Sequence, residues 1–232
     1  MEPWTSAAVS EIGARGANED AFLEAPDLRL WAVADGMGGH RHGEVASRTA
    51  LAGLKHAILE DADLPGAVVA ANRATWEEAR RRDSDMGTTL VALRLHPHRW
   101  ELAWLGDSRA YRWTGERLEQ LSTDHTLVQD WVAQGRISPA EARRHPYGHV
   151  LTRAAGLEQE AYPGTQEGPL AGSETFLLCS DGLTDTLGDE RIAAVLRESP
   201  PPEAPSALAE AVHAAGNPFQ DNLTVVVIGP RR

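Results

Sequence analysis

Aspartate residues recur along this chain in settings suited to binding divalent metal ions. Each stands in a turn-like context, and four directly follow a run of apolar residues. They are Asp20, Asp35, Asp107, Asp181 and Asp221. Carboxylate oxygens are hard ligands for Mg²⁺ or Mn²⁺, and several carboxylates at one point would repel each other strongly without cations between them. The pattern therefore predicts one acidic metal site assembled from distant parts of the chain.

Short apolar segments predict the strands that position these aspartates. They occupy residues 27–34, 99–105, 110–113, 116–121, 175–179 and 223–228. Residues 27–34 lead to Asp35 and a glycine-rich stretch at 36–39, which we expect to be a tight loop because glycine weakens a strand. Residues 223–228 are rich in β-branched side chains and predict a central strand that is buried on both faces.

Helices are predicted in the gaps between these strands. Apolar residues recur at helical spacing over 43–60 and about 65–82, and further helices are expected from Asp189 and around Leu208. The polar segment 122–156 predicts a helical insert rather than a strand. Within it, Ser138, Pro139 and Glu141 form the signature of a capped helix start.

The motifs around the aspartates follow one another in a fixed order along nearly the whole chain. They are Arg15 with Asn18-Glu19-Asp20, Asp35-Gly36-Met37-Gly38-Gly39-His40 with Gly43-Glu44, Met86-Gly87-Thr88-Thr89, Gly106-Asp107-Ser108-Arg109, Asp124-His125, Ser180-Asp181-Gly182 with Asp185, and Asp221-Asn222-Leu223-Thr224. Each motif alone is a weak signal. Taken together and in order, they show that the chain resembles the metal-dependent serine/threonine protein phosphatases of the type 2C (PPM) family, in the form common in bacteria.

The resemblance implies an α+β fold. The expected architecture is a four-layer α/β/β/α sandwich, in which helices flank a central antiparallel β-sandwich. A helical flap is expected at about 122–156, beside the site, where loops can change substrate preference without disturbing the scaffold. Residues 1–232 are expected to form a single type 2C phosphatase catalytic domain, which is compatible with a length of 232 residues.

The resemblance also implies roles for residues at the site. It implies two Mn²⁺ or Mg²⁺ ions, with Asp35 bridging them and the carbonyl oxygen of Gly36 as a further ligand, since a residue without Cβ lets the main chain approach an ion. The other carboxylates, binding directly or through water, are Asp20, Asp181 and Asp221. Glu19 and Asn222 are expected to lie behind these ligands.

Asp107 is the residue for which two interpretations stay open. The resemblance implies that it helps to hold a third, more weakly bound ion, with Asp181 shared between the sites. The alternative is a tight turn in which Asp107 caps its own backbone. In either case we expect the nearby Arg109 to pair with a carboxylate rather than with substrate.

The implied reaction is hydrolysis of phosphoserine and phosphothreonine in proteins by a water or hydroxide that bridges the metal ions. Arg15 matches the family's phosphate-binding arginine, and its planar fork suits two-point capture of phosphate. His40 is a candidate for protonating the leaving oxygen through a water molecule. A metal-bound water is the alternative proton donor.

Three other features favour structural roles. The segment Met86-Gly87-Thr88-Thr89 predicts close packing at the start of a strand, with hydroxyls that satisfy nearby backbone groups. His125 is expected to pack or hydrogen-bond near the insert. The only cysteine, Cys179, lies in an apolar run and predicts a buried thiol.

Composition limits the partners and the compartment. With 34 acidic and 22 basic residues, the formal charge of −12 argues against nonspecific nucleic-acid binding. The chain shows neither a secretory leader pattern nor an apolar run of about 18 residues, and we expect a cytoplasmic monomer without membrane contact. Its expected partners are phosphorylated proteins, including a bacterial Ser/Thr kinase and its targets. The alternative is a catalytically inactive, phosphatase-like binding module.

Overall fold

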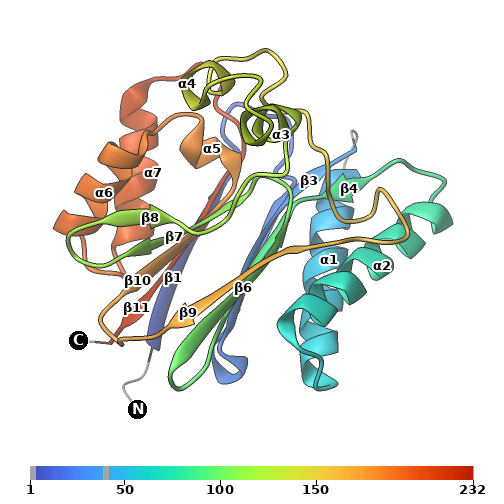
Figure 1. Cartoon of the computed structure of the whole chain (residues 1–232), viewed down its shortest axis with the longest axis horizontal. Helices are drawn as coiled ribbons and strands as arrows, with labels where there is room; N and C mark the ends of the chain where they lie inside the picture. Colours follow the sequence, from blue (N-terminus) through green and yellow to red (C-terminus); the bar gives the residue numbers. More distant parts are fainter. Residues whose placement is uncertain (1–3, 39–41, 232) are drawn as a thin grey trace.

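The computed structural model describes residues 4–38 and 42–231, which form two antiparallel β-sheets packed face to face. Helices cover the outer face of each sheet, so that the molecule has four layers (Figure 1). This arrangement confirms the predicted α+β fold and four-layer sandwich. Further short helices gather at one end of the layers.

The first sheet contains strands from both ends of the chain. Its order is β1 (Trp4–Glu11), β11 (Leu223–Pro230), β10 (Thr175–Cys179), β7 (Arg109–Trp113) and β8 (Leu118–Gln120). The predicted central strand over 223–228 is confirmed, because β11 pairs with β1 on one side and β10 on the other. Its side chains alternate between two cores, with Val225 and Val227 toward the helices and Val226 and Ile228 toward the second sheet.

The second sheet is built from the first half of the chain and one later strand. Its order is β2 (Asp20–Ala25), β3 (Leu30–Met37), β5 (Leu90–Leu95), β6 (Arg99–Leu105) and β9 (Gly164–Pro169), and the short β4 (Gly87–Thr88) pairs with β3. A 3-10 turn at Pro26–Leu28 joins β2 to β3. In β3, Ala32 and Ala34 face the covering helices, whereas Trp31 and Val33 pack between the sheets.

Two pairs of helices complete the outer layers. Helices α1 (His42–Leu59) and α2 (Leu64–Arg81) cover the second sheet, and α6 (Asp189–Glu198) and α7 (Ala204–Ala215) cover the first (Figure 1). Short helices α3 (Leu127–Ala133), α4 (Pro139–Ala142) and α5 (Asp181–Thr184) lie at one end of the sandwich. In α4, Ser138 and Glu141 form the predicted capping box.

The prediction that Asp35 lies in a tight loop is wrong. Strand β3 continues through Asp35 to Met37, because β2 and β4 pair with it on opposite sides. Asp35 stands directly opposite Asp20, and Gly36 opposite Thr88. Strand pairing therefore outweighs the low strand propensity of Gly36, and it places two carboxylates on adjacent strands.

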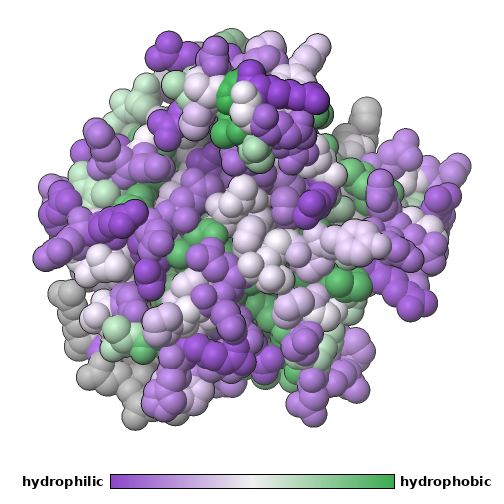
Figure 2. All heavy atoms as spheres, in the orientation of Figure 1, coloured by the Kyte–Doolittle hydropathy of each residue, from purple (hydrophilic) through white to green (hydrophobic). Residues whose placement is uncertain are grey.

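The surface is largely hydrophilic on the face shown in Figure 2, with hydrophobic residues in small groups. Within residues 4–38 and 42–231, every helix is too short or too polar to cross a lipid bilayer. The apolar side chains instead form the interiors between the layers, where residues such as Leu178 are 0% exposed.

The packing between the sheets should carry much of the stability. Leu178 of β10 lies in the core between the two sheets, so we expect Leu178→Ala to lower the free energy of unfolding by about 2–5 kcal/mol, as for other buried leucines. Urea denaturation followed by circular dichroism measures the change. The matched control is Leu59→Ala at the end of α1, where the side chain is 57% exposed; its expected effect is within about 0.5 kcal/mol. Equal effects would contradict the proposed importance of this core.

Candidate metal centre

Asp20 and Asp35 form the inner part of the candidate site. They are cross-strand partners in β2 and β3, and the backbone N–H of Gly36 donates to the carbonyl oxygen of Glu19 at 3.2 Å. Burial raises the pKa of Asp20 to about 6. Burial and the charge of Asp20 raise the pKa of Asp35 well above its usual range. Both pKa shifts indicate that these two carboxyl groups favour their neutral form unless a cation is bound beside them.

Hydroxyl groups from the Met86–Thr89 segment hold the backbone of Asp35. The N–H of Asp35 donates to Thr89 Oγ1, and Thr88 Oγ1 donates to the carbonyl oxygen of Asp35, both at 2.9 Å. Thr89 Oγ1 also shares a hydrogen bond of 2.6 Å with Ser108 Oγ. The prediction of a packed segment with backbone-satisfying hydroxyls is confirmed, since Met86 is fully buried. Sequence reasoning did not foresee that the backbone they hold is that of Asp35.

Gly36 lies where β3 passes closest to helix α1. A Cβ at position 36 would overlap the carbonyl oxygen of Gly43, and a Cβ at position 43 would approach the Glu19 carboxylate. Glu19 fastens the start of α1, because its Oε1 accepts from the N–H of Gly43 at 3.3 Å and its carbonyl oxygen accepts from Ser47 Oγ at 2.7 Å. The two glycines therefore let the strand and helix meet behind the carboxylates.

Asp181 reaches the same place from the first sheet. Ser180, the residue before α5, donates from Oγ to Asp20 Oδ2 at 2.7 Å and also accepts the N–H of Thr224 at 3.0 Å. The hydrogen bond from Ser180 to Asp20 joins the two sheets at the site. Burial and the charge of Asp107 raise the pKa of Asp181 well above its usual range.

The buried oxygen atoms fit a divalent cation. Asp20 Oδ1 and Asp181 Oδ1 are buried, and each lacks a hydrogen-bond partner among the residues that the structure describes. A buried carboxylate oxygen without a donor is costly. Hard cations such as Mg²⁺ and Mn²⁺ prefer such oxygens as ligands. The donor set therefore matches the metal ions that the sequence predicts.

Asp221 and Arg15 lie at the mouth of the site. The Arg15 guanidinium makes an ion pair with Asp221 Oδ2, and this hydrogen bond raises the pKa of Arg15, which stays charged. Asn222 ties the neighbouring loops together: its Oδ1 accepts from the N–H of Glu19 at 2.8 Å, and its Nδ2 donates to the carbonyl oxygens of Ile12 and Ala17. The Asn222 side chain thus fixes the backbone of residues 12–19, which leads to Asp20, beside Asp221.

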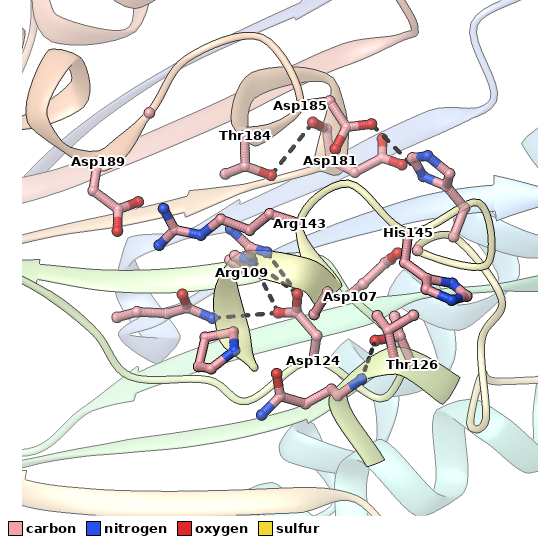
Figure 3. A pocket seen from close by; sticks show the side chains of 18 of the residues that line it. Asp107, Arg109, Asp124, Thr126, Arg143, His145, Asp181, Thr184, Asp185 and Asp189 are labelled. Atoms are coloured by element: carbon pink, nitrogen blue, oxygen red, sulfur yellow. Dashed lines mark hydrogen bonds and ion pairs between the residues drawn. The ribbon is translucent and has the colours of Figure 1, made fainter. Parts of the chain in front are cut away.

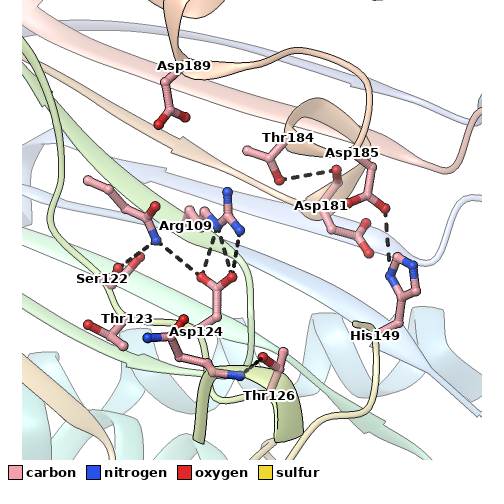
Figure 4. A network of polar contacts seen from close by, with 12 residues as sticks. Arg109, Ser122, Thr123, Asp124, Thr126, His149, Asp181, Thr184, Asp185 and Asp189 are labelled. Carbon is pink, nitrogen blue, oxygen red and sulfur yellow. Dashed lines mark hydrogen bonds and ion pairs between the residues drawn. The ribbon is translucent and has the colours of Figure 1, made fainter. Parts of the chain in front are cut away.

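Asp181 also belongs to a second cluster of possible metal ligands. Its other two members, His149 and Asp185, were not predicted from the sequence. Ligand atoms of His149, Asp181 and Asp185 all lie within 4.8 Å of one another, and His149 Nδ1 lies 3.7 Å from Asp185 Oδ2 (Figure 4). The spacing of Asp181 and Asp185 at the helix start was an available signal, because residues four apart share a helix face. Nothing local in the sequence marks His149, since the insert alone brings it here.

Asp107 lies near this second group. Burial and the charge of Asp124 raise its pKa to about 6. Figure 3 shows Asp107, Asp181 and Asp185 lining one cavity, whose volume is about 390 Å³. The structure therefore brings Asp107 to the edge of the carboxylate cluster. Its role as a ligand of a third ion stays a prediction.

Arg109 and His125 have structural partners. Arg109 donates from Nε and Nη2 to Asp124 (Figure 4), with the Nη2 to Oδ2 distance at 2.6 Å, as predicted for a carboxylate pair. His125 stacks on Trp104 with ring centroids 6.0 Å apart, and its Nδ1 accepts from the N–H of Gly106 at 3.2 Å. Burial and the charge of Arg153 lower the pKa of His125 to about 4. The prediction of a packed, hydrogen-bonded histidine is confirmed.

The structure thus brings most of the predicted site residues together. The charges of Asp20, Asp181, Asp107 and Asp221 all act on Asp35, and Arg15 lies close enough for Asp181 and Asp35 to raise its pKa further. His40 lies outside the described residues. The buried thiol of Cys179 is confirmed, and burial raises its pKa to about 12.

The fold and the carboxylate cluster define a class of sandwich proteins with an acidic metal site, and comparison with known proteins identifies the family. Residues 7–215 match the family model described as protein phosphatase 2C. The chain belongs to the protein phosphatase 2C family.

Individual relatives support the same family. The serine/threonine protein phosphatase PstP of Mycobacterium tuberculosis is 39% identical over 223 residues, which cover 92% of this chain and 42% of PstP. The chain therefore spans about two fifths of that relative. Serine/threonine phosphatase Stp of Listeria monocytogenes is 34% identical, covering 91% of this chain and 89% of Stp. A solved structure of the PstP catalytic domain with two manganese ions has a TM-score of 0.84 at 37% identity, with 97% of each chain covered.

Stability of the metal-free protein should depend on pH through Asp107. Its pKa in the folded protein is about 6, against about 3.9 in an unfolded chain. The stability linked to this group is therefore fully present below about pH 4 and is lost as the pH rises through about 6. With a chelator at pH 7.5, we expect Asp107→Asn to raise the free energy of unfolding by about 1–3 kcal/mol.

Thermal and urea unfolding at pH 4 and pH 7.5 test this expectation. At pH 4 the two proteins should differ far less, because the aspartate is then protonated in the folded state and about half protonated in the unfolded state. A variant that is equally or less stable than the original protein at pH 7.5 would contradict it.

Proposed function

We propose that this chain hydrolyses phosphoserine and phosphothreonine in proteins, with two Mn²⁺ or Mg²⁺ ions held by its clustered aspartates. The ligands would be the carbonyl oxygen of Gly36 and the carboxylates of Asp20, Asp35, Asp181 and Asp221. One observation carries the proposal: buried carboxylates from β2, β3 and the start of α5 converge in a member of this phosphatase family, where burial and neighbouring carboxylates raise the pKa of each. Bound there, the ions would act as Lewis acids and lower the pKa of water near the phosphoester.

The chain's own residues provide position and charge. Asp35 is held through its backbone by two threonines, and the charges of Asp20 from one sheet and Asp181 beside the other both act on it, so that it would hold the ions together with them. The guanidinium of Arg15 lines a cavity of about 330 Å³ together with Asp181 and Asp221. A phosphate entering this cavity would compete with Asp221 for the guanidinium, whose planar fork binds two phosphate oxygens.

Several finer assignments belong to the same proposal. Residues 1–232 act as one catalytic domain, and the protein is a cytoplasmic monomer. Asp107, with Asp181, holds a third and weaker ion, while His40 or a water molecule protonates the leaving oxygen. The substrates include a bacterial Ser/Thr kinase and its targets. The relatives' names support phosphoserine and phosphothreonine as the groups that are hydrolysed, since both PstP and Stp are called serine/threonine phosphatases.

Metal-dependent turnover tests the proposal and separates an enzyme from a binding module. With Mn²⁺ we expect hydrolysis of an aryl phosphate and of phosphothreonine peptides, and a chelator should abolish both. Asp35→Asn should lower kcat by about 10³-fold or more, because it removes a central ligand. The matched control is Asp27→Asn, in the exposed turn between β2 and β3 at the far end of both strands, with expected activity near that of the original protein. A folded, Mn²⁺-loaded protein without turnover would favour the binding module.

Arg15 provides a separate test of phosphate binding. We expect Arg15→Ala to lower kcat/KM for phosphopeptides by about 10²-fold, and Arg15→Lys to recover only part of it, because an ammonium group lacks the planar fork. Arg73→Ala is the matched control, since Arg73 is an exposed arginine paired with Glu77 on α2. Calorimetric Mn²⁺ titration should show that the ions still bind. Full activity of Arg15→Ala would refute the phosphate-binding role.

A further inference from the structure

The aromatic side chain of Phe219 is exposed to solvent at the mouth of the candidate site. Its side chain is 85% exposed, more than that of the other large apolar residues with high exposure in the described part of the chain. An exposed aromatic ring forgoes the free energy of burial, and Phe219 lines the cavity that contains Arg15.

The backbone that carries Phe219 is fastened at both ends of a tight turn. The N–H of Phe219 donates to Asn217 Oδ1 at 3.0 Å, and the N–H of Gln220 donates to the carbonyl oxygen of Asn217 at 3.3 Å. The buried Gln220 side chain donates to the carbonyl oxygen of Gly182 at 2.8 Å and accepts from Thr186 Oγ1 at 2.7 Å. The ring thus extends from a turn that is anchored to α5. Because the turn is already ordered, covering the ring with a ligand costs little conformational entropy.

The same turn lies between two cavities, which share Asn217 and Gln220 as lining residues. On one side, Phe219 lines the cavity of about 330 Å³ that also contains Arg15 and Asp221. On the other side, Asn217 and Gln220 line a second cavity of about 630 Å³, which includes Ile12 with 44% of its surface exposed. Phe219 therefore lies in the cavity of the phosphate-binding arginine, and Ile12 lies in the neighbouring cavity.

We propose that Phe219 forms a substrate-docking surface that binds an apolar side chain next to the phosphorylated serine or threonine. The inference rests on the proposed function, because Arg15 must hold the phosphate. An extended peptide advances about 3.3 Å per residue. With its phosphate at Arg15, it brings a neighbouring side chain over the ring that shares the cavity. Phe219 is thus a specificity residue and takes no part in the chemical step.

Phosphothreonine peptides of defined sequence test this surface. In a glycine-flanked peptide, each position from three residues before to three residues after the phosphothreonine is replaced in turn by Leu, Arg or Ser. We expect Leu at one or more positions on one side to raise kcat/KM roughly fivefold over Ser, as partial burial of one apolar side chain would do. Phe219→Ser should abolish this preference, and Phe219→Leu should retain part of it.

Three controls keep the outcomes distinct. Turnover of the glycine-flanked peptide and of an aryl phosphate should be nearly unchanged in Phe219→Ser, because the ring does not contact the reacting atoms. Leu59→Ser removes an exposed apolar side chain at the far end of α1 and should keep the Leu preference. The same Leu to Ser ratio in the original protein and in Phe219→Ser, or a preference for Arg that depends on Phe219, would overturn this inference alone. Loss of all turnover in the original protein would overturn the proposed function and the inference together.

Discussion

Repulsion between buried carboxylates is the constraint on which the rest of this structure depends. Asp20, Asp35 and Asp181 are gathered where water is scarce, and burial together with the neighbouring charges raises the pKa of each. Without compensating cations such a cluster opposes folding. The scaffold must therefore hold these side chains in place against their mutual repulsion, and binding of divalent cations would return free energy to the folded state.

The β-sandwich meets this demand by placing rigid supports behind each carboxylate. Strand pairing sets Asp20 against Asp35, and Ser180 connects the first sheet to Asp20 of the second. Threonine hydroxyls fix the Asp35 backbone, while Gly36 allows helix α1 to approach from behind. Because these supports come from packed elements rather than loops, they fix the positions of the carboxylates.

The mouth of the site is more exposed to solvent than the carboxylates behind it. Arg15 and Asp221 are partly exposed, and the short turn with Phe219 stands beside them. Here the chain can vary without disturbing the carboxylates, because the turn contributes little to the cores between the layers. The site thus combines buried carboxylates that the scaffold holds in place with a partly exposed rim.

Local patterns in the sequence determined strands β3, β6, β7, β8, β10 and β11, most of the helices and the set of aspartates, but not strands β1, β2 and β9. The layers were implied by the family that the ordered motifs resemble. The sequence misplaced Asp35 in a loop, since only pairing with β2 and β4 keeps Gly36 extended. It also missed His149 and the link from Ser180 to Asp20, which joins residues 160 positions apart. Tertiary structure alone decided these contacts, because packing between distant segments sets them and no local pattern encodes which side chains will meet.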